Sequence, residues 1–330
     1  MIRRDFITLN CKCAIVLLLA AVGAPSAAFA QRQPVKDPRI GFLYGGVSEA
    51  LWRVNAFVEG VRGTERRHFE LVSRVAEGDP ARLPALASDI VAQKVVVIFA
   101  VGPPAVRAAH AVAPNLPVVA LDLETDPVDS GLVSSLSHPG GSVTGVFFDF
   151  PDFGTKWLEL LREVLPKVSR LGVFWDPSTG RVQLNAVERV AGSMGFSLRM
   201  IEVKDRGSLE QVFSTARKEN AEALVLLSSP IFGSQPATSA KLALEYRFPA
   251  ITLFPEFAQA GGLLAYGPNI SDLYRQAGTM VAKVLAGTAP ADLPVERPIR
   301  FQLVINLKTA QVLGIDVPPG LPLRADEVIE

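Results

Sequence analysis

Short apolar segments alternate with longer amphipathic segments along the chain from Arg39 onward. The apolar segments are rich in Val, Ile, Leu and Phe and have no polar face, which is typical of strands in a parallel sheet that helices cover on both sides. The amphipathic segments have helical periodicity. The first series predicts strands at 40–44, 69–75, 95–100 and 117–121, and helices at 50–66, 81–93 and 103–112. This order predicts a doubly wound α/β unit.

A second series with the same alternation follows. It predicts helices at 155–164, 183–194, 209–219 and 238–247, and strands at 171–175, 197–203, 223–227 and 250–254. Two similar series in tandem predict two lobes. The length agrees, because 330 residues exceed what one hydrophobic core usually serves.

Three segments are expected to connect the lobes. They are 142–149, 263–267 leading into a helix at 270–285, and a strand-like run at 300–306 after a proline-marked loop at 289–298. Three crossings form a hinge, and a hinge between lobes creates a cleft that closes. The predicted fold is therefore α/β, with two doubly wound parallel-sheet lobes joined by a three-crossing hinge. We assign 31–145 with about 268–290 to lobe 1, and 146–267 with about 291–330 to lobe 2.

The first thirty residues have the pattern of a secretory signal peptide. Arg3 and Arg4 precede an apolar run at 14–22, which is too short to span a bilayer comfortably, and 28–30 offers small side chains to a signal peptidase. Cleavage is expected after Ala30, which would place the mature protein in the periplasm. The paired arginines also resemble a twin-arginine signal, so that route and the general secretory route both stay open.

Composition and charge narrow the classes of partner. Both cysteines, Cys11 and Cys13, precede the apolar run and would leave with the signal peptide, so no disulfide, cysteine metal site or lipid anchor is expected. The chain has 33 basic and 33 acidic residues, of which three and one lie in the first thirty, leaving a mature net charge of −2. A near-neutral chain without a Lys/Arg cluster has no electrostatic footprint for nucleic acid or an anionic membrane.

Signatures of enzymes are sparse. His68, His110 and His138 are scattered without metal-ligand spacing, and no phosphate-binding glycine loop follows a strand. The run at 191–195 approaches a nucleophile elbow, but it lacks the leading glycine and closes a helix instead of following a strand. We expect a monomer that is not an enzyme and has no metal or cofactor. A periplasmic hydrolase or dehydrogenase is the remote alternative, and turnover of a bound ligand would establish it.

Several stretches of the sequence are similar to one family. They are 126–133 (DPVDSGLV), 139–145 (PGGSVTG), 260–269 (AGGLLAYGPN), 272–275, 304–310 and 323–329. These stretches resemble the ABC transporter substrate-binding proteins with a type 1 periplasmic-binding fold, and the resemblance covers nearly the whole mature chain. It implies a bilobed receptor that closes on one small solute and docks on an ABC permease. A periplasmic sensor for a chemoreceptor or kinase is the alternative, which the sequence does not separate from a transport role.

Ligands in open α/β sheets collect beyond the carboxyl ends of the strands, where loops and helix N-termini converge. The candidate ligand-binding residues at such positions and at the second crossing are Tyr44, Gly45, Gly46, Gly102, Pro103, Asp122, Asp126, Trp175, Asp176, Ser228, Ser229, Glu256 and Tyr266. This set predicts contacts from both lobes.

The chemistry of these positions favours a small zwitterion. Helix N-termini at Pro103 and Pro230 present free amides that suit a carboxylate, and acidic side chains after the fourth strand, including Glu124, suit an ammonium group. Aromatic side chains, among them Tyr44 and Trp175, suit an apolar group. We therefore predict a hydrophobic or aromatic amino acid. A sugar would also use aromatic faces, but the strand-end loops are poor in Asn and Arg.

Each candidate position also has a purely structural interpretation. Gly45 and Gly46 suit an ordinary tight turn, and the prolines suit plain helix starts. Trp175 could close the core, while Asp176 could cap the next helix. At least two of the three acidic residues after the fourth strand are expected to be solvated or to cap turns.

Overall fold

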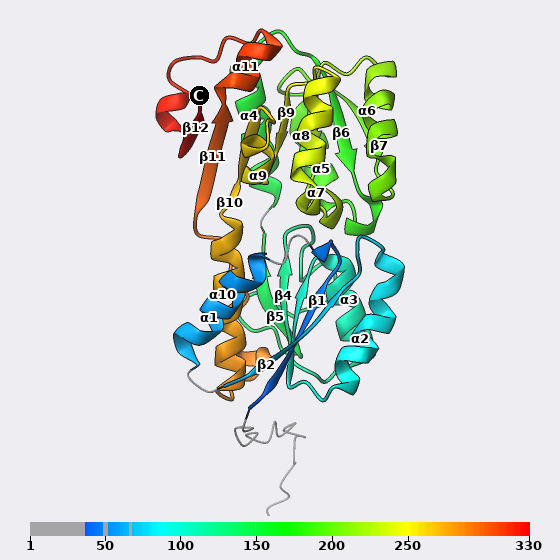
Figure 1. Cartoon of the computed structure of the whole chain (residues 1–330), viewed down its shortest axis with the longest axis vertical. Helices are drawn as coiled ribbons and strands as arrows, with labels where there is room; N and C mark the ends of the chain where they lie inside the picture. The colour runs from blue at the N-terminus through cyan, green and yellow to red at the C-terminus, as the bar shows by residue number, and fades with distance from the viewer. Residues whose placement is uncertain (1–36, 49–51, 66–67, 149) are drawn as a thin grey trace, which may run out of the picture. The chain divides into compact units, whose positions relative to one another are not determined.

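Residues 37–48, 52–65, 68–148 and 150–330 are described by the computed structural model (Figure 1). They belong to one compact unit at 33–330. The predicted signal peptide at 1–30 lies outside the described residues.

The first sheet confirms the predicted doubly wound unit. Its strand order is β2-β1-β3-β4-β5, and every neighbouring pair is parallel. The strands are β1 Arg39–Tyr44, β2 Glu70–Val75, β3 Val97–Val101, β4 Val118–Asp122 and β5 Val143–Phe147. All residues of β3, β4 and β5 are buried, because helices cover both faces of the sheet.

Four helices cover the first sheet. They are α1 Trp52–Thr64, α2 Leu83–Ala92, α3 Pro103–Val112 and α10 Ile270–Leu285. The pair α1 and α10 lies over one face, and α2 and α3 lie over the other (Figure 1). Two glycines let α1 and α10 pack backbone to backbone: a Cβ at Gly60 would lie 2.0 Å from the carbonyl oxygen of Arg275, and one at Gly278 would lie 2.2 Å from that of Phe57. This packing sets the position of α1 on the sheet.

The second sheet has the strand order β12-β11-β10-β9-β8-β6-β7. Its strands are β6 Arg170–Trp175, β7 Ser197–Glu202, β8 Ala223–Leu226, β9 Ala250–Thr252, β10 Leu264–Pro268, β11 Phe301–Asn306 and β12 Glu327–Ile329. The pairing is parallel except between β10 and β11, which are antiparallel. The helices of this half are α4 Phe150–Val164, α5 Val182–Ala191, α6 Leu209–Lys218, α7 Pro230–Ser234, α8 Pro236–Glu245, α9 Pro255–Gln259 and α11 Leu307–Leu313.

The chain passes between the two sheets three times. It leaves the first sheet after β5, returns after β10 to form α10, and leaves again before β11. Two segments predicted as links, 142–149 and 263–267, contain the strands β5 and β10. Each includes a glycine in close contact with a neighbouring backbone, and this glycine interrupts the short apolar run. A Cβ at Gly145 would lie 2.1 Å from the carbonyl oxygen of Ala120 in β4, and one at Gly267 would lie 1.9 Å from that of Leu253, which follows β9. We therefore propose a lobe boundary after Phe147 in place of one after Gly145.

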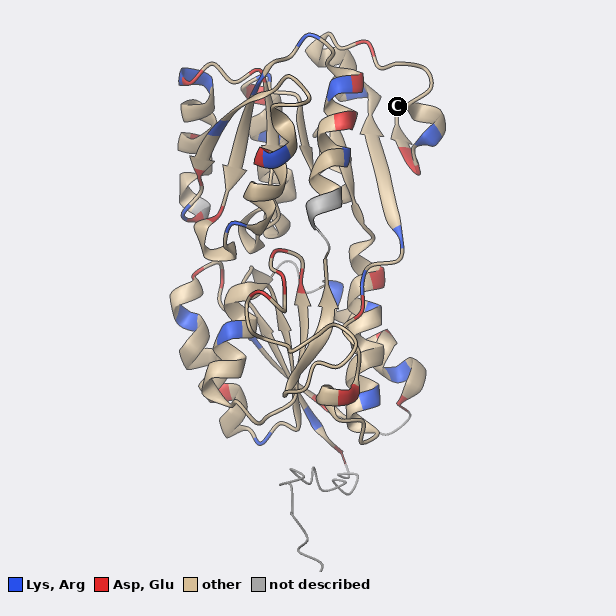
Figure 2. Ribbon diagram, turned by 180° about the vertical axis from the view of Figure 1, so that it is seen from behind, with Lys and Arg blue, Asp and Glu red and all other residues tan. Residues whose placement is uncertain are grey.

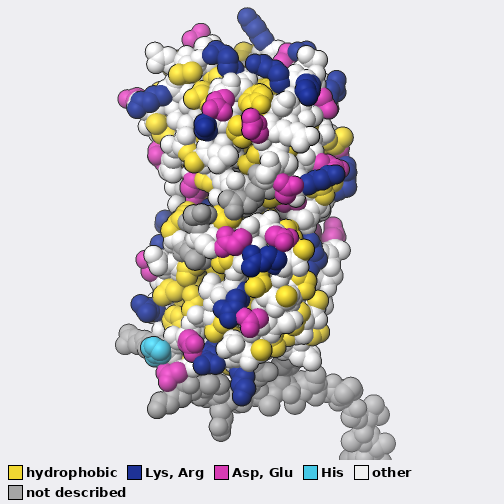
Figure 3. Space-filling model, turned by 45° about the vertical axis from the view of Figure 1, so that its right-hand side comes forward, with side chains coloured by type: hydrophobic (Ala, Val, Ile, Leu, Met, Phe, Trp, Pro, Cys, Tyr) yellow, Lys and Arg dark blue, Asp and Glu magenta, His cyan; other side chains and the backbone are white. Residues whose placement is uncertain are grey.

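Charged residues of both signs are mixed along the chain. Figure 2 shows basic and acidic segments interspersed in both halves, and one face of the surface in Figure 3 carries both signs side by side. None of the helices in the described part of the chain has the length and apolar character of a membrane span.

Candidate functional site

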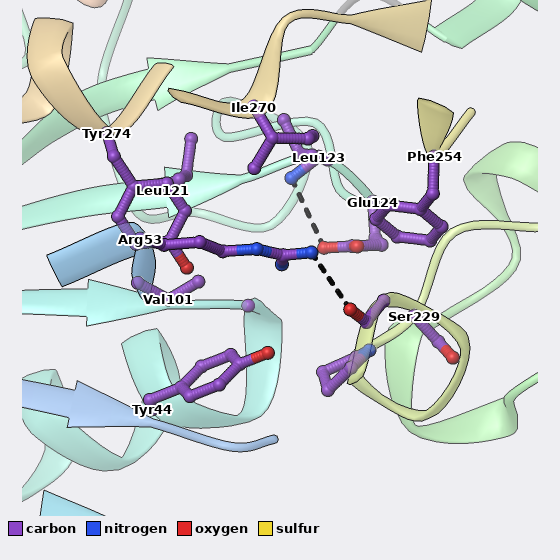
Figure 4. Close-up of a pocket in the computed structure, with 13 residues that line it drawn as sticks. Tyr44, Arg53, Val101, Leu121, Leu123, Glu124, Ser229, Phe254, Ile270 and Tyr274 are labelled. Carbon is purple, nitrogen blue, oxygen red and sulfur yellow. Dashed lines mark hydrogen bonds between the residues drawn. The ribbon is translucent and has the colours of Figure 1, made fainter. Parts of the chain in front are cut away.

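A pocket lies where the carboxyl ends of the first sheet meet loops of the second half (Figure 4). Its cavity is about 40 Å³ in volume. The residues that line it are Tyr44, Arg53, Val101, Gly102, Leu121, Leu123, Glu124, Ser229, Pro230, Gly233, Phe254, Ile270 and Tyr274. The wall is therefore mostly apolar and aromatic, with one basic and one acidic side chain.

Strand register brings the first wall together. Tyr44 of β1 is paired with Val101 of β3, and Val101 is paired with Leu121 of β4, so three adjacent strands end at the same level. Gly102 follows β3 with φ +84°, a conformation that favours glycine. A Cβ at Gly102 would also lie 3.2 Å from the ring of Pro230 in the second half, so glycine allows the two halves to approach closely.

Arg53 is the basic residue of the pocket and comes from the first turn of α1. Its side chain extends across the pocket between Tyr274 and Tyr44 (Figure 4), and only 5% of the residue is exposed. Nη2 donates a hydrogen bond to the carbonyl oxygen of Gly233 at 2.9 Å and lies 3.6 Å from Oε1 of Glu256. Burial alone would lower the pKa of Arg53, but Tyr44, Tyr274 and Glu256 together raise it. The guanidinium is therefore charged at any physiological pH.

Two tyrosines flank this guanidinium. Burial raises the pKa of both Tyr44 and Tyr274, so both hydroxyls are neutral donors near neutral pH. Tyr274 packs edge-on against Phe99, which in turn stacks on Phe57 with ring centroids 4.4 Å apart. The Tyr44 hydroxyl is buried and has no hydrogen-bond partner among the residues that the structure describes. This hydroxyl is available to a ligand.

Glu124 is the acidic residue of the pocket and follows β4. Its Oε2 accepts a hydrogen bond from the backbone amide of Leu123 at 3.2 Å, and its Oε1 accepts one from Oγ of Ser228 at 2.5 Å. Burial, and then the nearby charge of Asp122, raise the pKa of Glu124 to about 8. The carboxyl is therefore mostly protonated at pH 7 in this arrangement.

Asp122 shapes the loop that presents Glu124. It is buried at the end of β4 and accepts hydrogen bonds from the amide of Glu124 at 2.9 Å, the amide of Thr125 at 3.0 Å and the Thr125 hydroxyl at 2.5 Å. Burial raises the pKa of Asp122 despite these bonds. Its carboxylate closes the turn and does not line the pocket.

Three hydrogen bonds tie the two halves together across this region. Besides the bonds of Arg53 to Gly233 and of Ser228 to Glu124, Nη2 of Arg107 on α3 donates to the carbonyl oxygen of Ser178 at 2.7 Å. They join α1, the loop after β4 and α3 of the first half to α7, the segment before α7 and the turn at Pro177–Thr179 of the second half. The walls of the pocket are therefore held in contact.

Three of the thirteen candidate residues line the pocket, namely Tyr44, Gly102 and Ser229. Glu124 and Pro230, which the sequence suggested for an ammonium group and a carboxylate, also line it. The candidates outside the lining are Gly45, Gly46, Pro103, Asp122, Asp126, Trp175, Asp176, Ser228, Glu256 and Tyr266. Ser228 and Glu256 still contact lining residues through the bonds described above. Residues of both halves line the pocket, and the prediction that a ligand contacts both halves stays a prediction.

Several candidates outside the lining have structural partners. The indole of Trp175 donates to the carbonyl oxygen of Gly180 at 2.7 Å, and Asp176 caps the short turn at Pro177–Thr179. Asp126 caps the next turn of its own loop. The ring of Tyr266 stacks on that of Phe153 at 4.9 Å.

The remaining candidates are placed by backbone packing. Gly46 lies against the ring of Tyr44, where a Cβ would come within 2.4 Å of the ring. Gly45 faces Pro230 at an ordinary contact distance, and Pro103 begins α3. These three positions therefore shape the wall beside the pocket.

Sequence reasoning missed Arg53, Tyr274 and Phe254. Arg53 had a detectable signal, because it lies three, four and seven residues before Ala56, Phe57 and Gly60, on the face of α1 that is buried. A basic residue on an apolar helix face is unusual and indicates a specific partner. Tyr274 and Phe254 had no such signal, since an aromatic residue in either context is ordinary core.

The described ranges hold no group of three or more His, Cys, Asp or Glu side chains placed to bind a metal ion. The chemistry that the pocket offers is recognition: a cation, hydroxyl donors, a carboxyl and apolar walls.

Comparisons with known proteins identify relatives of this chain. The family model for ABC transporter substrate binding protein matches residues 31–329. A tyrosine-binding protein of Clostridioides difficile (strain R20291) is 28% identical over 242 residues, which cover 73% of this chain and 69% of that protein.

Solved structures share the fold. An ABC domain from Streptococcus pneumonia in complex with L-Trp has a TM-score of 0.79 at 24% identity, covering 89% of this chain and 100% of that one. A conserved domain protein from Vibrio cholerae has a TM-score of 0.81 at 22% identity with the same coverage. The ligand-free, open structure of a substrate-binding protein with adhesive properties from Clostridium difficile has a TM-score of 0.61 at 24% identity, covering 89% and 99%.

Proposed function

This chain belongs to the ABC transporter substrate-binding protein family, and from that premise we propose that it is an exported receptor that binds an amino acid with an apolar or aromatic side chain and delivers it to an ABC permease. Proteins of this family bind small-molecule ligands and work with ABC permeases. The proposal assigns no catalytic step to the chain.

One observation carries the proposal: both halves of the molecule contribute to a single pocket whose walls combine aromatic and apolar side chains with one basic and one acidic group. Tyr44, Tyr274 and Phe254 provide flat apolar surface. Arg53 provides a positive charge for the carboxylate of a zwitterion, and Glu124 provides a carboxyl for its other end. That carboxyl is mostly protonated in this arrangement, and an ammonium group beside it would favour its ionised form. A few convergent polar groups in an apolar cleft are typical of small-molecule sites.

The relatives support the same ligand class. The Clostridioides difficile relative is a tyrosine-binding protein, and the Streptococcus structure contains L-Trp. Both ligands are aromatic amino acids.

The size of the cavity supports a mechanism in which the halves separate. A cavity of about 40 Å³ holds roughly three water-sized groups, which is less than an aromatic amino acid requires. Ligand entry therefore requires the walls to move apart at the three crossings, with rupture of the bonds from Arg53 and Ser228. Closure on the ligand is then favoured by the contacts that the ligand makes with both halves.

Calorimetry on the protein purified from the periplasm tests the ligand class. We expect heat of binding with L-tyrosine, L-tryptophan or L-phenylalanine, and none with glucose, ribose or allitol. Small-angle scattering should then show a smaller radius of gyration with saturating ligand than for the ligand-free protein. Tight binding of a sugar together with no response to any amino acid would reject the ligand class.

Location and assembly are part of the proposal. We expect the mature protein to begin at Gln31, to be recovered from the periplasm and to be a monomer. N-terminal sequencing, intact mass and light scattering measure these properties, and a retained lipid or a dimer would contradict them.

A further inference from the structure

The guanidinium of Arg53 has more donors than acceptors around it. Arginine carries five N–H donors. Nη2 donates to the carbonyl oxygen of Gly233, whereas Nε has no hydrogen-bond partner among the described residues. Nε is also shielded from solvent, because only 5% of the residue is exposed. A buried donor without an acceptor costs about 1–3 kcal/mol, and more when it is charged. The position is therefore unfavourable unless something else supplies an acceptor.

The nearest carboxylate of the chain does not fill this role. Oε1 of Glu256 lies 3.6 Å from Nη2 of Arg53, which is an ion-pair distance without a hydrogen bond, and Oε2 of Glu256 has no partner within the described part of the chain. Glu256 is also absent from the lining of the pocket. It stabilises the charge of Arg53 but accepts no hydrogen bond from Nε.

A second unpartnered donor faces the same cavity. The hydroxyl of Tyr44 is buried, lines the pocket and, like Nε of Arg53, lacks an acceptor in the described ranges. Figure 4 shows the ring of Tyr44 on one side of the Arg53 side chain, which crosses the pocket. Two donors with no acceptor, one of them charged, match an anion with two oxygens, and a carboxylate fits the planar fork of arginine best.

Arg53 is held by a rigid element. It lies about two turns before the contact in which Gly60 of α1 meets the backbone of α10, and α10 in turn packs on the first sheet. A side chain carried by such a helix keeps its place when the halves separate. The guanidinium would therefore meet an entering ligand already in position.

We propose that Arg53, assisted by the hydroxyl of Tyr44, forms a carboxylate-binding subsite that makes this receptor select ligands carrying a carboxylate. The inference rests on the proposed function, because it assigns one end of the same pocket. The carboxylate replaces the missing acceptors of Nε and the tyrosine hydroxyl, and the rest of the ligand lies against the apolar wall. A ligand that lacks the carboxylate leaves both donors buried and unpaired.

Matched ligands separate this role from a merely structural one. The probes are L-tyrosine, tyramine, which lacks the carboxylate, and 3-(4-hydroxyphenyl)propanoate, which lacks the ammonium group. Calorimetry on the wild-type protein should give an affinity for L-tyrosine roughly 10- to 100-fold higher than for tyramine, the range for a hydrogen bond to a charged group. The variant Arg53→Met should lose most of that ratio, and Tyr44→Phe should reduce it several-fold.

A second arginine on the same helix provides the control. Arg62 is exposed in the last turn of α1, so Arg62→Met should leave both affinities unchanged. If Arg53→Met does not fold, Arg53→Lys keeps a charge but removes the fork, and it should also weaken L-tyrosine without weakening tyramine. The wild-type ratio between the two ligands tests the subsite without any variant.

The outcomes distinguish this inference from the proposed function. Binding of L-tyrosine with equal affinity by the wild-type protein and Arg53→Met would overturn the subsite and leave the proposed function standing. Binding of the propanoate but of no amino acid, lost in Arg53→Met, would support the subsite and overturn the amino-acid ligand. Binding of tyramine as tight as that of L-tyrosine, or no binding of any carboxylate probe, would overturn the subsite.

Discussion

Replacement of Glu124 by Gln should remove a large part of the pH dependence of stability. Gln is close in size to Glu and retains an oxygen acceptor for the amide of Leu123 or the hydroxyl of Ser228. It does not titrate. The difference between the wild-type protein and this variant therefore reports the titration that depends on the Glu124 carboxyl.

The sign follows from the two pKa values. Glu124 has an ordinary pKa of 4.5 when unfolded and a pKa of about 8 in the folded protein, because it is buried beside Asp122. Below pH 4.5 both states are protonated, and the folded state has its full stability with respect to this group. Between pH 4.5 and 8 the unfolded state ionises while the folded state stays protonated, so unfolding releases a proton and stability falls as the pH rises. Above pH 8 the effect is constant.

The magnitude is about 1.4 kcal/mol per pH unit in that window. Between pH 5 and pH 8 the free energy of unfolding of the wild-type protein should thus fall by about 4 kcal/mol relative to that of the variant. The two stability curves should cross, with the wild-type protein the less stable of the two near pH 8. Asp122 is present in both proteins, but its titration is coupled to that of Glu124, so the comparison reports the titration of this pair of carboxyls.

Urea denaturation at pH 5, 6, 7 and 8, followed by circular dichroism and tryptophan fluorescence, measures the effect. The variant Glu245→Gln, in an exposed ion pair with Lys241, is the control and should run parallel to the wild-type protein. Parallel curves for Glu124→Gln would refute the reasoning, because they would mean that the carboxyl is ionised in the folded protein at neutral pH.

Two further predictions concern packing and the apolar wall. Gly60→Ala should lower the free energy of unfolding, measured by urea denaturation, by roughly 1–3 kcal/mol, because the new Cβ would lie 2.0 Å from a backbone oxygen of α10. Gly63→Ala on the same helix is the control and should be neutral or slightly stabilising, because a Cβ there has no atom within 4 Å. Equal effects of the two variants would exclude the backbone contact. Phe254→Ala should weaken amino-acid binding by roughly 1–3 kcal/mol in calorimetry, because Phe254 lines the pocket. Trp175→Ala should leave the affinity unchanged, because its indole is hydrogen-bonded to a loop outside the lining. A loss of affinity in Trp175→Ala but not in Phe254→Ala would place the ligand elsewhere.

Helices whose ends carry strong local signals could be predicted almost residue by residue. The helix α3, with prolines at its start, has the predicted bounds 103–112, and α10, which follows Asn269 as an N-cap, has the predicted bounds 270–285. In both cases the information lies within a few residues of the boundary. The buried strand β3, Val97–Val101, was also predicted, at 95–100, because an unbroken apolar run is typical of a parallel sheet.

Strands that depend on a distant partner could not be predicted. β5 and β10 each contain a glycine whose role is to let a neighbouring backbone approach, and this role is invisible without the neighbour. The antiparallel pairing of β10 with β11 is likewise set by the return of the chain after α10. Local pattern therefore indicated links where the structure has strands.

The same distinction applies to the site. The sequence by itself determined that strand ends of two lobes are the expected place for a ligand, because the alternation of strands and helices puts those ends at one edge. It also identified Tyr44, Gly102 and Ser229, which line the pocket. Only the tertiary structure decided that Arg53, from the first turn of α1, reaches the same cavity, because the close packing of α1 on α10 directs that side chain over the end of the sheet. The polarity pattern of a sequence reports which residues are buried, whereas the partners that a buried charge meets depend on contacts between segments far apart in the chain.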